Sequence, residues 1–146
     1  MDMKRIAIGT IVGAVVIQAA GLVLFDLIVS GFYAANTSDA GRAVFRMPPL
    51  RLAFALADLS MAALLTIGVA LRNNATIGGG FATGAVIGLL IAVYVSAGFY
   101  GNTTIWALPA HVVHPLVVSL QAGIAGAVIA AVLARVPKGA AVRAAE

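Results

Sequence analysis

The sequence predicts an all-α integral membrane protein whose four transmembrane helices pack as a compact bundle, and three observations lead to this fold class. Of the 146 residues, 62% are hydrophobic and 10% are charged, whereas a soluble domain carries about 25% charged residues. The mean hydropathy is +1.08. Four apolar segments recur along the chain, each long enough to cross a hydrocarbon core of about 30 Å as a helix of about 20 residues. We expect one membrane domain over residues 1–146.

The four expected spans are separated by short polar connections. Lys4 and Arg5 precede the first span, but its apolar run exceeds the 7–15 residues of a signal-peptide core, so we interpret it as a retained span. The segment between the first two spans is polar and ends in Pro48-Pro49, a stiff lead-in to the second span. We expect it to be an outer loop, and the C-terminal tail to be disordered. The expected ranges are 6–32, 50–71, 77–100 and 112–134 for the spans, 34–49 for the outer loop and 136–146 for the tail.

The basic residues predict the orientation. They divide six against three between the two sides, and the more basic side is expected to be cytoplasmic. This places both termini in the cytoplasm, and the alanine-rich composition favours a bacterial inner (cytoplasmic) membrane. We therefore interpret the sequence pI of about 10.1 as a topology signal, not as a sign of nucleic-acid binding. The six are Lys4, Arg5, Arg72, Arg135, Lys138 and Arg143; the three are Arg42, Arg46 and Arg51.

Small residues recur every four positions in the third and fourth spans. Such ridges let helix backbones approach closely in lipid, where the hydrophobic effect does not drive helices together. The ridges could pack within one four-helix bundle, or one of them could form the face of an oligomer. The expected helix-packing residues are Gly80, Gly84, Gly88, Gly123 and Gly126.

Polar and aromatic residues gather at the outer ends of the spans, whereas the inner half is mostly Ala, Val, Ile, Leu and Gly. A conducting path needs a polar or water-filled lining from side to side. The asymmetry therefore argues against a channel and favours a site that opens to the outer side. Its candidate residues are Asp58, Asp26, Arg51, Arg46, His111, His114, Tyr94, Tyr100 and Trp106.

Asp58 lies inside the apolar stretch "RLAFALADLSMAALLTIGVALR", where a carboxylate is costly unless a partner receives it. An arginine, such as Arg51 two turns earlier, or a histidine could form a structural contact with it. A hydrogen bond to Ser96 or Gln121 is a second possibility, and a proton- or cation-coupling role in transport is a third. Asp26 near the interface is expected to be solvated by headgroups.

The motif "HVVHP" raises the question of metal or pigment binding. His111 and His114 are three residues apart, but the residue before a proline avoids the α region, so we expect His114 at the helix cap and Pro115 at the first helical position. A histidine on a membrane helix can ligate haem or a pigment, and a metal site would need a third ligand such as Asp26 or Asp58. Interfacial histidines bonded to headgroups, or a pH-sensing role, are the alternatives. We assign no metal and no cofactor.

Catalysis is the function class with the least support. The chain has no cysteine, which excludes thiolate chemistry, and none of the phosphate-loop, zinc-protease or nucleophile-elbow motifs occurs. We expect a small non-catalytic protein that acts through helix–helix association in the bilayer, as a homo-oligomer or as an accessory subunit among other membrane chains. A small homo-oligomeric transporter that uses a membrane-embedded Asp, and haem or pigment binding through an outer-side His, are the alternatives.

Overall fold

The computed structural model describes residues 2–72 and 76–137, and these are all-helical with no strand. An isolated β-bridge joins Thr37 to Trp106. The expectation of disorder for residues 138–146 lies outside the described residues. The elements are α1 (Met3–Gly21), the π-helix η1 (Leu22–Ile28), α2 (Ser30–Ala35), α3 (Asp39–Val44), α4 (Arg51–Leu71), α5 (Ile77–Asn102) and α6 (Leu108–Arg135).

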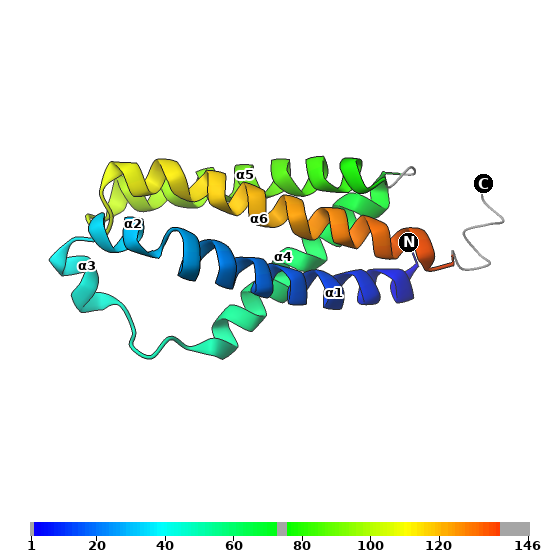
Figure 1. The fold of residues 1–146 in the computed structure, drawn as a ribbon, viewed down its shortest axis with the longest axis horizontal. Helices are drawn as coiled ribbons and strands as arrows, with labels where there is room; N and C mark the ends of the chain where they lie inside the picture. Colours follow the sequence, from blue (N-terminus) through cyan, green and yellow to red (C-terminus); the bar gives the residue numbers. More distant parts are fainter. Residues whose placement is uncertain (1, 73–75, 138–146) are drawn as a thin grey trace.

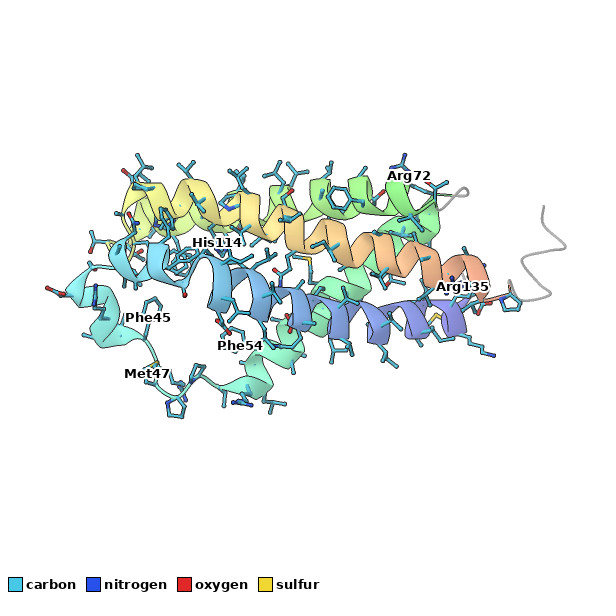
Figure 2. The ribbon with its side chains drawn as sticks, viewed as in Figure 1. Phe45, Met47, Phe54, Arg72, His114 and Arg135 are labelled. Carbon is cyan, nitrogen blue, oxygen red and sulfur yellow. The ribbon has the colours of Figure 1, made fainter. Side chains whose placement is uncertain are left out.

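Four stretches of helix are long and apolar enough to cross a membrane, as the sequence predicts. They are Met3–Ile28, Arg51–Leu71, Ile77–Asn102 and Leu108–Arg135. The start of α1 and the end of α6 lie at the same end of the molecule (Figure 1), where the Arg5 guanidinium donates to the Leu133 carbonyl over 2.8 Å. Arg72 and Arg135 both lie toward this end, away from His114 (Figure 2). The cytoplasmic assignment of the termini stays a prediction.

The first span is not the single helix over 6–32 that the sequence predicts. It passes from α1 into the π-helix η1 and breaks at Val29, whose φ and ψ are −109° and 6°. Ser30 and Gly31 follow, and neither favours the helix interior. A π segment turns the side chains beyond it relative to an α-helix, so the face that follows in α2 is not the one an uninterrupted helix would present.

The expected outer loop is partly helical. Ser38 caps α3 by accepting from the Gly41 N–H over 3.0 Å, as serine does at helix N-termini. The Ser38 N–H donates to the Ile105 carbonyl, and the Ala107 N–H donates to the Asn36 carbonyl. These bonds tie α3 to the connection between α5 and α6. Residues 36–38, between α2 and α3, are non-helical and half-buried, whereas residues 45–50, which lead into α4, are non-helical and exposed throughout.

Helices α5 and α6 form the closest contact in the molecule, through their glycines. A Cβ on Gly84 would collide with the Ala122 carbonyl, and one on Gly80 would collide with the Gly126 carbonyl. A Cβ on Gly88 would lie 2.5 Å from the Ala122 Cβ. Such backbone-to-backbone packing is available only to small residues, and it sets an antiparallel register in which Gly84 lies opposite Ala122.

The buried core lies where α1, α4 and α6 meet. Gly9 packs against Thr66, and Gly13 against Ala62 and Ile129. Gln121 donates to the Ile17 carbonyl over 2.9 Å, which adds a polar tie between α6 and α1. The buried core residues are Ile17, Ala62, Leu65, Val69, Ala122, Ala125, Ile129, Ala130 and Leu133.

Only the second half of α4 takes part in this core. Its buried residues are Ala62, Leu65, Thr66 and Val69, whereas residues 51–60 contain no buried side chain. Helix α4 crosses α1 obliquely, and its N-terminal end lies to the side of the other helices (Figure 1). The N-terminal half of α4 therefore leaves the bundle.

Replacing Gly84 with leucine should destabilise the fold, because the new side chain must displace the backbone of α6. Overpacking costs about 1–3 kcal/mol, and we expect the upper end because the obstacle is a backbone carbonyl. The measurement is thermal unfolding followed by circular dichroism in mild detergent. Gly98→Leu is the control, since a Cβ there meets nothing within 4 Å. Equal melting temperatures for the two variants would contradict this packing.

Candidate functional site

An aromatic cluster closes the end of the molecule opposite Arg135. Trp106 lies at its centre, with its ring centroid 5.4 Å from that of Tyr33 and 5.6 Å from each of His111 and His114. The cluster draws on η1, α2, the α3–α4 connection, α5, the α5–α6 connection and α6. Its members are Phe25, Phe32, Tyr33, Phe45, Tyr100, Trp106, His111 and His114.

Both histidines lie inside α6, which corrects the expectation that His114 caps this helix. The helix begins at Leu108, and Pro109 in its first turn needs no N–H partner. Pro115 is buried within the helix, and the α5–α6 register brings it level with Ile91 and Ala92. Since Pro115 has no N–H, it leaves the His111 carbonyl without its usual helical donor. Membrane helices tolerate this interruption when neighbouring groups compensate.

His114 is held by Tyr33. The Tyr33 hydroxyl and His114 Nδ1 share a hydrogen bond of 3.2 Å, and the two rings meet edge-to-face with centroids 6.2 Å apart. Burial raises the pKa of Tyr33 from 10.0 to about 12, because it disfavours the charged phenolate. The phenol is therefore neutral at physiological pH and can donate to Nδ1.

His111 is the most buried polar side chain of the cluster, with 6% of its surface exposed. Tyr100 and Trp106 flank its ring. Neither ring nitrogen has a hydrogen-bond partner among the described residues, and the same holds for the Ser96 hydroxyl. The α5–α6 register places Ser96 level with Ala110 and His111. An unpaired buried polar group costs about 1–3 kcal/mol. A small ligand that could hydrogen-bond to His111 or Ser96 would therefore be favoured here over an apolar ligand.

Of the nine candidate site residues, the structure brings together His111, His114, Tyr100 and Trp106. Tyr94 is 82% exposed on α5 and belongs to none of these ring contacts. Arg46 lies in the exposed segment 45–50, and Asp26 is exposed on η1. Asp58 and Arg51 lie on the N-terminal half of α4.

Asp58 does not find the partner expected for it within the described residues. It is half-buried and makes no hydrogen bond or ion pair there, and neither do Asp26 and Arg51. Gln121, one of the partners considered, donates instead to Ile17. The described residues also contain no group of three His, Cys, Asp or Glu that could hold a metal ion, so the carboxylates do not join the histidines in a ligand set.

Sequence reasoning missed Tyr33 and Phe25 as site residues. The Phe25 ring lies 5.9 Å from Tyr33 and 5.7 Å from His114. Eight residues separate Phe25 from Tyr33, and an uninterrupted helix would not stack them on one side so directly. The signal that could have found them is the pair Ser30-Gly31, which marks the break in the helix.

A shallow depression of about 540 Å³ lies beside the cluster, between α3 and the end of α5. Tyr100 connects the two, since its ring lines the depression and also contacts His111. The lining residues are Ala40, Val44, Tyr100, Gly101, Asn102, Thr103, Thr104 and Ile105.

No protein-family model, curated protein or solved structure matches this chain.

Tyr33→Phe should remove one component of the pH dependence of stability. The native pKa of Tyr33 is about 12 and the reference value is 10.0, so the unfolded phenol ionises first and the free energy of unfolding falls as the pH rises from 10 to 12. Below pH 10 this contribution is constant. Denaturation at a series of pH values tests it, and Tyr94→Phe is the control. A fall over pH 10–12 that is as large in Tyr33→Phe as in the wild type would contradict the assignment.

Proposed function

We propose that this chain is a small non-catalytic four-span membrane protein that acts through helix–helix association, as a homo-oligomer or as an accessory subunit. The observation that carries this proposal is the outer half of α4. Residues 51–60 have no buried side chain, and Asp58 and Arg51 have no partner in the described residues. Charged groups inside membrane helices normally face protein or a water-filled cavity, so half of this span calls for a second protein surface.

The aromatic cluster gives this association an orientation. Tyrosine and tryptophan collect at membrane–water interfaces, and Arg72 and Arg135 lie toward the opposite end (Figure 2). Under the proposal, the termini are cytoplasmic in a bacterial inner membrane and the cluster faces the outer side. There, His111 and the adjacent depression form a polar and aromatic site open to that side.

The first test is the native mass of the protein purified in mild detergent from its own membrane, with an absorption spectrum of the same sample. We expect either a species at an integer multiple of 14.7 kDa or a complex with other membrane chains. A monomer without other chains would contradict the proposal. A Soret or chlorophyll-like band that bleaches in His114→Ala would shift the function to pigment binding.

A small homo-oligomeric transporter is the second candidate, and the unpaired Asp58 favours it. The carboxylate lies on the same helical face as Ala62 and Leu65, one turn beyond the last buried position of α4. It therefore points toward the inside of an assembly instead of toward lipid.

Asp58→Asn separates the two functions. A transporter that couples through this carboxylate should lose uptake in proteoliposomes by at least tenfold while its oligomeric mass is unchanged. A protein that acts only through association should keep its oligomeric mass in Asp58→Asn. It should show no substrate-dependent proton flux in the wild type or in the variant. Ser60→Ala, two residues away on the same exposed half, is the matched control.

A further inference from the structure

The outer half of α4, residues 51–60, forms an arm that the rest of its own chain does not cover. Leu52 is 78% exposed and Phe54 58% exposed. Phe54, together with Phe45 and Met47 on the preceding connection, lies at the side of the helices (Figure 2). We call residues 51–60 the α4 arm.

Helix geometry places the start of the arm within the hydrocarbon layer. Helix α4 has 21 residues, which at 1.5 Å per residue gives a length of about 30 Å, the thickness of the layer itself. Because α4 crosses α1 obliquely (Figure 1), its extent along the membrane normal is shorter than its length. With its inner end at the inner surface, Arg51 and the non-helical residues just before it lie below the outer surface.

Non-helical backbone at that depth is tolerated only where protein buries it or where it lines a water-filled cavity. Residues 45–50 are exposed throughout, and only Phe45 among them has a contact in the aromatic cluster. The arm and the segment that leads into it therefore need a protein surface against them.

The same chain carries a matching surface at the same depth. Helix η1 has no buried residue, and it makes no substantial contact with α4 of its own chain. Its exposed residues are Leu22, Val23, Asp26, Leu27 and Ile28.

The charges on the two surfaces are complementary. Arg51 on the arm and Asp26 on η1 are both exposed and both without a partner among the described residues. Gly9 lies opposite Thr66 and Gly13 opposite Ala62. Because α4 crosses α1 obliquely (Figure 1), Arg51 lies at or below the level of residue 24 in depth, in the same half of the molecule as Asp26.

We propose that the α4 arm docks on η1 of a second copy of this chain, where Arg51 pairs with Asp26 of that copy. Copies with the same topology are related by an axis along the membrane normal, which preserves depth, and a two-fold axis makes the contact reciprocal. Each dimer then contains the Arg51–Asp26 pair twice. This inference rests on the proposed function and names its partner and its contact residues.

Charge reversal tests the pair. Arg51→Asp and Asp26→Arg should each weaken self-association of the full chain at least tenfold, measured in detergent by dilution-dependent energy transfer between labelled copies. The double variant should recover to within threefold of the wild type. Arg135→Asp is the matched control, because it makes the same charge change on an exposed residue at the opposite end of the molecule (Figure 2), and it should stay near the wild-type value. Thermal unfolding of each variant confirms that it is folded.

Cysteine cross-linking tests the contact without changing its charges, since the chain has no cysteine of its own. Leu52→Cys in one tagged copy should form a disulfide with Val23→Cys in a differently tagged copy in native membranes. The control partner is Leu90→Cys, which is exposed on α5 and lies at a similar depth by the helix registers. It should give no hetero-disulfide with Leu52→Cys.

The outcomes separate this inference from the proposed function. The docking site alone is overturned if the wild type forms a homo-oligomer, both charge-reversal variants associate as strongly as the wild type, and Leu52→Cys cross-links equally to Val23→Cys and to the Leu90→Cys control. A stable complex with other chains and no self-association also overturns it, while supporting the accessory-subunit function. A monomer without partners overturns both.

Discussion

The contact between α5 and α6 is the constraint on which the rest of the molecule depends. Glycines at residues 80, 84 and 88 allow the two backbones to touch, and lipid supplies no hydrophobic force that could substitute for this packing. The contact fixes the register of α6, and α6 then presents Ile129 to Gly13 of α1 in the core that α1, α4 and α6 share. It also brings Ser96 level with His111, so the buried part of the aromatic cluster follows from the same glycines.

The two ends of the molecule are held together by different kinds of contact. Toward the end that carries Arg72 and Arg135, α1, α4 and α6 share a core of small and aliphatic residues. Toward the other end, α4 departs, α1 gives way to a π-helix, and aromatic rings with a Tyr33–His114 hydrogen bond hold α2 to α6. Buried polar atoms without partners among the described residues occur in both halves: Thr66 Oγ1 in the core, and Ser96 Oγ and the His111 ring nitrogens at this second end. The site and the docking surface are proposed in the second half, where α4 leaves the bundle.

The number and approximate bounds of the membrane-spanning helices could be predicted from the sequence, because they depend on composition. Four spans follow from apolar runs, and the expected bounds of 50–71 and 77–100 differ by two residues or less from α4 and α5. The pair Ser30-Gly31 marks the break that follows Val29, but the π segment before it could not be predicted, because a π segment has no strong sequence signal. The prediction that Pro115 begins the helix was wrong. Packing against α5 outweighed the local preference of the residue before proline for a non-helical backbone. The sequence placed Trp106 and the two histidines near one another at one end of the spans, and their rings are in contact. The departure of α4, which separates Asp58 and Arg51 from them, depends on a crossing angle that no spacing encodes.

Under our proposal, a second copy of this chain covers the α4 arm. A single spin label at Leu52, introduced through cysteine in the otherwise cysteine-free chain, reports on it directly through dipolar distance measurements in proteoliposomes. We expect a narrow distance distribution between labels on two copies, and a dipolar signal that falls in proportion as unlabelled chain is mixed in. The absence of any dipolar signal at high protein-to-lipid ratio, or a broad distribution that dilution with lipid alone abolishes, would contradict it.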